Sequence, residues 1–83
     1  MKYTYRPKGT CSSAIEFEID ENELLHNVRY TGGCNGNLKA IGLLTEGMKA
    51  SEIASKLRGN ICDFRSTSCA DQLARAIEEA LAQ

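Results

Sequence analysis

Four cysteines, Cys11, Cys34, Cys62 and Cys69, are the residues of this 83-residue chain whose type and placement could do chemistry. Each stands beside small or turn-forming residues, whereas cysteines that only fill core volume usually lie among aliphatic side chains. The thiolate form of cysteine binds soft metal ions and attacks disulfides. The placement therefore favours metal binding or thiol chemistry over simple packing.

The spacing of the cysteines leaves three interpretations open. A tetrahedral zinc site needs four thiolates that converge on one point, and all four cysteines are its candidate ligands. Zinc is then the expected cofactor, although the cysteines lack the close pairing of zinc fingers. In the second interpretation Cys62 and Cys69 form a reversible redox pair, and in the third the cysteines are structural and unlinked.

Composition and charge exclude several classes of protein. The formal net charge is −1, from ten basic and eleven acidic residues, and no basic cluster stands out, so nucleic acid is not an expected partner. No apolar run resembles a signal peptide or a membrane span. We therefore expect a cytoplasmic protein, where thiols stay reduced and structural disulfides are rare.

Period-two alternation predicts strands in the first part of the chain. Residues 14–20 alternate apolar and acidic side chains, which is typical of a half-buried strand. After a polar turn, residues 24–31 supply a return strand, and residues 2–6 add an edge strand that ends at Pro7. The expected inward side chains are Ile15, Phe17 and Ile19 on the first strand and Leu24, Val28 and Tyr30 on the second.

Three helices are expected after the Gly32–Gly33 turn. The first begins at residues 35–37 and ends near Gly47, the second covers residues 51–58, and the third follows a Ser68 cap. The expected inward side chains are Leu38, Ile41, Leu44 and Met48, then Ile53 and Leu57, then Leu73, Ile77, Ala80 and Leu81. Strands followed by helices predict one α+β domain over residues 1–83, a small antiparallel sheet covered on one face by two or three C-terminal helices.

These elements assign each cysteine a place. Cys34 and Cys69 stand at helix starts, where the positive end of the helix dipole stabilises a thiolate. Cys62 lies in the loop before Cys69, and Cys11 precedes the first clear strand. We therefore expect the four sulfur atoms to converge near one end of the sheet.

Other residues point less clearly to chemistry. The Gly32–Gly33 turn lacks the dinucleotide and P-loop spacings, so a nucleotide or phosphate ligand there is an alternative reading beside a tight turn. His26 is the only histidine and is expected as a partly buried sheet residue, and Glu16, Glu18 and Asp20 are expected on a solvated face. Nothing points to an enzyme. The partner is unknown, and an exposed sheet edge is compatible with a homodimer.

The cysteine segments resemble a known family. Residues 30–37, residues 53–62 and the run Thr67-Ser68-Cys69-Ala70-Asp71-Gln72-Leu73 resemble the TSCPD domain family, named for a Thr-Ser-Cys-Pro-Asp motif. Ala70 replaces the proline, and alanine can hold the same first helical turn.

The chain as a whole is similar to small standalone four-cysteine members of that family. Their larger relatives are C-terminal domains of adenosylcobalamin-dependent ribonucleotide reductases. The resemblance implies that Cys34, Cys62 and Cys69 belong to the shared pattern and that Cys11 belongs to the standalone group. It implies a metal site, or alternatively a thiol-redox accessory role beside a reductase.

Overall fold

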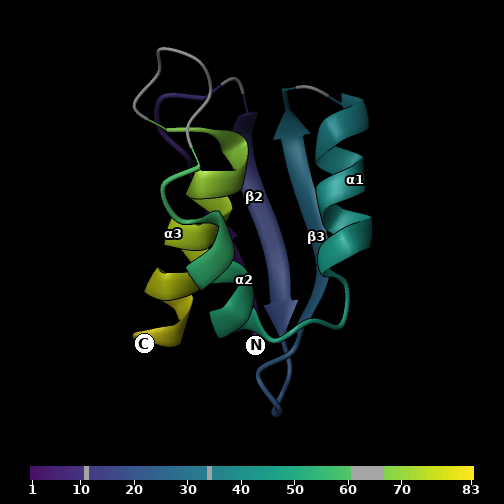
Figure 1. Ribbon diagram of the computed structural model, residues 1–83, viewed down its shortest axis with the longest axis vertical. Helices are drawn as coiled ribbons and strands as arrows, with labels where there is room; N and C mark the ends of the chain where they lie inside the picture. The colour runs from purple at the N-terminus through teal and green to yellow at the C-terminus, as the bar shows by residue number, and fades with distance from the viewer. Residues whose placement is uncertain (11, 34, 61–66) are drawn as a thin grey trace.

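The fold is a three-stranded antiparallel sheet followed by three helices, as shown in the computed structural model of Figure 1. The structure describes residues 1–10, 12–33, 35–60 and 67–83. The elements are β1 (Lys2–Tyr5), β2 (Ser12–Ile19), β3 (Leu25–Gly32), α1 (Asn35–Thr45), α2 (Ala50–Leu57) and α3 (Cys69–Leu81). The strand order β1-β2-β3 confirms the α+β prediction, including the hairpin and the third, edge strand.

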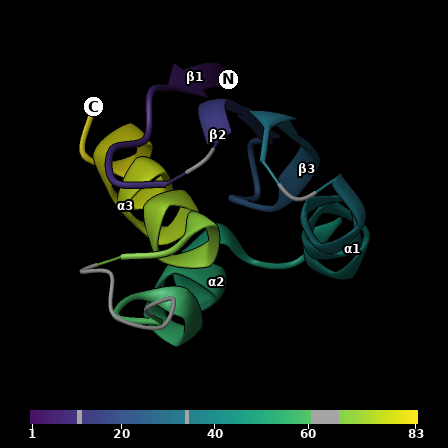
Figure 2. The same cartoon turned by 90° about the horizontal axis from the view of Figure 1, so that it is seen from above.

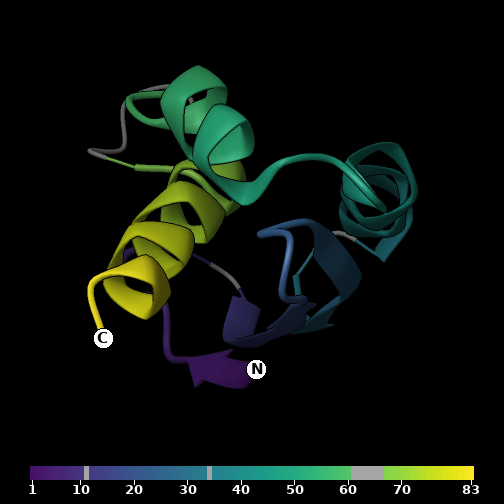
Figure 3. The ribbon, with the colours of Figure 1, turned by 90° about the horizontal axis from the view of Figure 1, so that it is seen from below.

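Helices α2 and α3 lie on one face of the sheet, and α1 lies along its β3 edge (Figures 2 and 3). Figures 2 and 3, which look along the strands, show α3 over β2 and α1 beside β3, with α2 against α3. No helix in the described ranges is long and apolar enough to cross a membrane.

The core lies between β2 and the two C-terminal helices. The alternating pattern of β2 is confirmed, because Ile15, Phe17 and Ile19 are all buried. They pack with Leu25 of β3 and with the buried side chains Ala50, Ile53, Ala54, Leu73, Ala74, Ala76, Ile77 and Ala80 of the helices. Leu57 and Leu81, both expected inward, lie half-buried at the margin of this cluster.

A β-bulge changes the phase of β3. Glu16 pairs with Arg29 while Glu18 pairs with His26, so two residues of β3 stand opposite Phe17. Asn27, one of the two, has a φ of 55°. The extra residue shifts the alternation, so the prediction that Leu24 faces inward is wrong. Leu25 is the buried residue, and it shares the inner face with Val28 and Tyr30.

Helix α1 also differs from its prediction at one position. Leu38 and Ile41 face inward as expected, but Leu44 is 75% exposed, and the buried residue of the last turn is Thr45. Successive residues are about 100° apart around a helix, so Leu44 and Thr45 cannot share the inner face. Gly42 sits where α1 approaches β3, since a Cβ atom there would lie 3.0 Å from the carbonyl oxygen of Val28.

Helix α3 begins as its cap predicts. Ser68 has an extended backbone, and its Oγ accepts a hydrogen bond from the Asp71 N–H at 3.0 Å. Leu73, Ile77 and Ala80 are buried, and Arg75, Glu78 and Glu79 are exposed. The cap fixes the first residue of the helix as Cys69.

Candidate functional site

The start of α3 brings Cys69 to the end of the sheet. The Sγ atom of Cys69 lies 3.4 Å from the Oγ atom of Ser12, the first residue of β2. The hydroxyl of Tyr30, on β3, donates a hydrogen bond to the Cys69 carbonyl oxygen at 2.9 Å. Cys69 as a whole is half-buried.

Tyr30 is held in its neutral form at this position. Burial is the main cause that raises the pKa of Tyr30 above its usual range, and the neighbouring Cys69 thiol adds to the effect. The hydroxyl therefore keeps its proton at neutral pH and remains a donor to the first turn of α3.

Ser68 ties the helix start to the residue before the Cys62 segment. Besides accepting from the Asp71 N–H, its hydroxyl donates a hydrogen bond to the Asn60 carbonyl oxygen. Asn60 immediately precedes residues 61–66, which contain Cys62 and lie outside the described residues. One end of that segment is thus attached to the turn that carries Cys69.

The buried side chain of Asp71 makes a second attachment, to residues on either side of the Cys62 segment. Its side chain is 1% exposed. It accepts hydrogen bonds from the Gly59 N–H at 2.7 Å, from Arg75 Nε at 2.8 Å and from the Thr67 hydroxyl. Gly59 and Thr67 flank residues 61–66 on either side, so this carboxylate anchors the two described ends of the Cys62 segment.

The same hydrogen bonds decide the charge of Asp71. Burial alone would raise the pKa of this carboxyl, but the bonds from Thr67, Arg75 and Gly59 outweigh it and hold the pKa at about 2. Asp71 is therefore ionised at neutral pH, with both oxygens engaged. The sequence indicated its role in the helix cap but not its burial.

A further contact brings the β1–β2 connection to the same place. Gln72 donates from Nε2 to the Thr67 hydroxyl at 2.9 Å, and its Oε1 accepts from the Lys8 N–H at 3.2 Å. Gly9, with a φ of 77°, lies so close that a Cβ atom there would be 3.1 Å from Thr67. The residues that lead to Cys11 therefore dock against the start of α3.

Only one of the four predicted ligands can be placed. Cys69 is described, whereas Cys11, Cys34 and Cys62 lie outside the described residues. Within residues 1–10, 12–33, 35–60 and 67–83, no three His, Cys, Asp or Glu side chains are grouped as a metal site. The convergence of the four sulfur atoms and the zinc site remain predictions.

His26 belongs to a separate cluster at the opposite end of β3. Its Nε2 lies 2.7 Å from Asp20 and its Nδ1 lies 2.5 Å from Glu46. The hydrogen bond to Asp20, followed by the one to Glu46, raises the pKa of His26. The side chain is 32% exposed, as a partly buried sheet residue should be, but the sequence did not reveal its two carboxylate partners.

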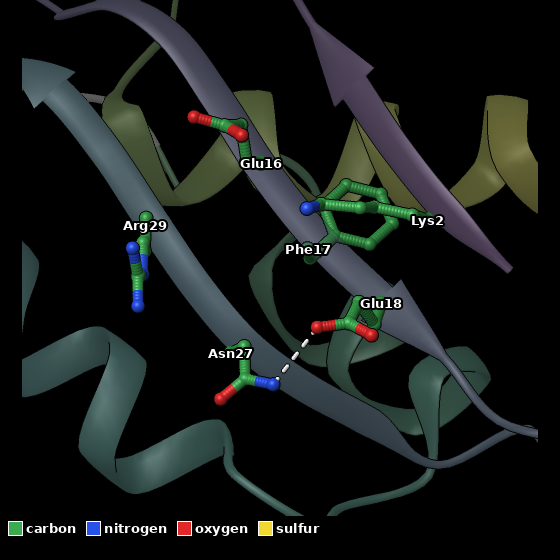
Figure 4. A pocket seen from close by; sticks show the side chains of 6 residues that line it. All are labelled: Lys2, Glu16, Phe17, Glu18, Asn27 and Arg29. Carbon is green, nitrogen blue, oxygen red and sulfur yellow. Dashed lines mark hydrogen bonds between the residues drawn. The ribbon is translucent and has the colours of Figure 1, made fainter.

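The outer face of the sheet is polar, as expected. A shallow hollow of about 180 Å³ lies there, and Figure 4 shows the side chains that line it: Lys2, Glu16, Phe17, Glu18, Asn27 and Arg29. Asn27 donates a hydrogen bond to Glu18 at 2.9 Å across it. A second hollow, of about 240 Å³, lies beside Gly32 and is bordered by Arg29 and Lys39. It adjoins the diglycine turn, for which the sequence offered a phosphate ligand as an alternative.

The comparison with protein families agrees with the motif at the start of α3. The family described as the TSCPD domain matches residues 1–81. No curated protein and no solved structure matches the chain. The match covers nearly all of the 83 residues, including the Thr67, Ser68, Cys69 and Asp71 positions of the motif. The chain belongs to the TSCPD domain family.

Proposed function

We propose that this protein is a small binding module that holds one metal ion, zinc being the expected one, through Cys11, Cys34, Cys62 and Cys69. The proposal rests on the residues that surround Cys69. Described residues next to Cys11 and near Cys62 contact this thiol or the cap beside it, and one near Cys34 is paired with the strand residue that touches the thiol.

The neighbours can be named one at a time. Ser12 follows Cys11 in the chain, and its Oγ lies 3.4 Å from Cys69 Sγ. Gly32 is paired with Ser12 in the sheet and stands two residues before Cys34. Asn60, two residues before Cys62, is hydrogen-bonded to Ser68. Consecutive Cα atoms are only about 3.8 Å apart, which supports convergence of the four thiols at this end of the sheet.

The chemistry of this end suits a thiolate site. The hydroxyl of Ser12 can donate a hydrogen bond to the sulfur of Cys69, and such donors support thiolate ligands. Four thiolates at the corners of a tetrahedron are a common structural zinc site. Such an ion would add folding free energy to a domain whose core is small and largely aliphatic. We propose no catalysed reaction.

Elemental analysis tests the proposal on protein purified under reducing conditions without chelator. We expect one zinc per chain, four thiols protected from a thiol reagent, and loss of zinc in each single Cys→Ser variant. His26→Gln is the matched control, because His26 is the only histidine and lies outside the proposed site, so this variant should keep its zinc.

Two outcomes would contradict the metal site. One is a chain without metal whose four thiols all react freely. The other is a disulfide between Cys62 and Cys69 that forms reversibly in a glutathione titration, which would favour the thiol-redox accessory role instead.

A further inference from the structure

Helix α1 differs from the other helices in the character of its exposed side. The exposed residues of α3 include Arg75, Glu78 and Glu79, and those of α2 are polar as well. In α1, Leu43 is 73% and Leu44 75% exposed. A helix with apolar residues on both sides is usually buried on both sides.

The outward residues of α1 and of the turn after it form a face that has no charged residue at its centre. We call this surface the α1 outer face. It consists of Gly36, Ala40, Leu43 and Gly47, with Leu44 on one flank, and all five are exposed. Gly47 has a φ of 77° and ends the helix, which explains its glycine. No comparable backbone requirement explains the glycine at position 36. A Cβ atom there would meet nothing within 4 Å, although glycine is a poor helix former.

No other element covers this face within the described part of the chain. Figures 2 and 3 show α1 at one flank of the molecule, apart from α2 and α3. The outer edge of β3 near α1 is already engaged. Leu25 bonds to Gly47 and Met48 through its backbone, and the Asn27 N–H bonds to Glu46. A partner would therefore meet α1 here before it met the backbone of this edge.

We propose that the α1 outer face packs against the same face of a second copy of this chain, as an antiparallel pair of helices about a twofold axis. A twofold contact needs a self-complementary surface. Antiparallel pairing places Gly36 opposite Gly47 of the partner subunit and Ala40 opposite Leu43 of the partner subunit. Small residues thus meet each other at the two ends, and each leucine meets an alanine in the middle.

The charges beside this face agree with the same pairing. Lys39 and Glu46 border one shallow hollow of about 230 Å³, which Leu43 also lines, so they share a flank of the helix. Lys39 stands toward the N-terminal end of α1, and Glu46 follows its last residue. Antiparallel pairing therefore brings Lys39 near Glu46 of the partner subunit, twice in each dimer. Lys39 forms no ion pair with the described residues of its own chain, and Glu46, which also contacts His26 and Asn27, is 48% exposed.

The contact is small, so the dimer should be weak. A helix of 11 residues is about 16 Å long, and contacts of this size belong to the low end of specific interfaces. The proposal is independent of the metal, since it uses no residue of the cysteine site.

Sedimentation equilibrium of the full chain between about 10 µM and about 1 mM tests the proposal. We expect a reversible monomer–dimer equilibrium for the wild type. Leu43→Asp should raise the dissociation constant at least about tenfold, because a leucine loses its burial in the contact. Ser55→Asp, an exposed change on α2, is the matched control and should leave the constant unchanged.

The charge pairing has its own test. Lys39→Glu should weaken the dimer, because it sets two negative charges against each other, while Lys56→Glu on α2 should not. Amide NMR shifts of the wild type should depend on concentration in α1 and not in β1, a readout that needs no substitution. A wild type that stays monomeric at about 1 mM overturns the proposal. So does a dimer that Leu43→Asp leaves intact, or shifts that move along β1 instead.

Discussion

Thr67, Ser68 and Asp71 each have a defined task at the start of α3. Ser68 caps the helix and bonds to Asn60, Asp71 binds Gly59 and Arg75 inside the protein, and Thr67 donates to Asp71. These three motif side chains hold the first turn and the described ends of the Cys62 segment. Cys69 is the motif residue left with a reactive group directed at the end of the sheet.

Replacing the buried carboxylate of Asp71 tests whether the motif side chains hold the first turn of α3. Asp71→Asn should lower the free energy of unfolding by about 2 kcal/mol. The ion pair with Arg75 is lost, and the amide NH₂ group that replaces one carboxylate oxygen cannot accept the buried hydrogen bond made there. Urea unfolding measures the change. Glu78→Gln removes an exposed partner of Arg58 and should cost less than about 1 kcal/mol.

The same residue predicts a loss of stability in acid. The pKa of Asp71 is lowered from 3.8 to about 2, so its stabilising effect is complete above pH 4 and is lost as the pH falls toward 2. The wild type should therefore lose more stability than Asp71→Asn over this interval. Equal losses in the two proteins would show that the carboxylate is not held ionised by its neighbours.

At the scale of the elements, α1 is fastened to β3 at two points. His26 and Asn27, at the bulge, bind Glu46 at the end of the helix, and Gly42 lets the helix approach the backbone of Val28. Together these contacts hold α1 against β3. They also decide which side of α1 faces outward.

The His26 contact should respond to pH near neutrality. Asp20 and then Glu46 raise the pKa of His26 above 6.5, so its stabilising effect is present below that value and is lost as the pH rises through the raised pKa. The melting temperature should fall between pH 6 and pH 9 more in the wild type than in His26→Gln. An NMR titration of the imidazole with an unshifted pKa would contradict the cluster.

The close approach at Gly42 gives a second prediction at this scale. Gly42→Ala should destabilise the protein by about 1 kcal/mol, because its Cβ atom would press on the Val28 carbonyl. Gly36→Ala faces open space and should be neutral or stabilising by up to about 1 kcal/mol. Urea unfolding in dilute solution compares the two. Equal gains in both variants would mean that α1 does not pack closely on β3.

How far the sequence predicts these elements depends on whether the deciding contacts are local. The alternation of β2 and the cap of α3 are local, and both predictions were confirmed. The bulge at Asn27, whose N–H bonds to the sequence-distant Glu46, is not visible in the periodicity, which alone placed Leu24 inward in error. Burial of Asp71 likewise depends on Gly59, which comes from the end of α2.

On the scale of the whole molecule, the proposed functions occupy separate places. Cys69 lies where Ser12 and Tyr30 bring β2 and β3 to α3, and the His26 cluster lies at the other end of β3. The α1 outer face is on a flank. The cysteine site and the α1 outer face share no residue, so these two proposals can be tested separately.

Removal of the metal tests whether the cysteine site is independent of the His26 cluster. A strong chelator should lower the melting temperature, and added zinc should restore it, because binding to the folded state alone stabilises that state. The imidazole titration of His26 should be unchanged by the treatment. A melting temperature that does not respond to chelator would contradict a structural metal.

Native mass spectrometry of the freshly purified, reduced chain is the sharpest test of the four-cysteine zinc site, since one spectrum reports both bound metal and disulfides. We expect one dominant species, the chain with one zinc ion and four deprotonated cysteines, in monomer and dimer alike. A metal-free chain carrying four thiols, or one that has lost two hydrogens to a disulfide, would contradict it.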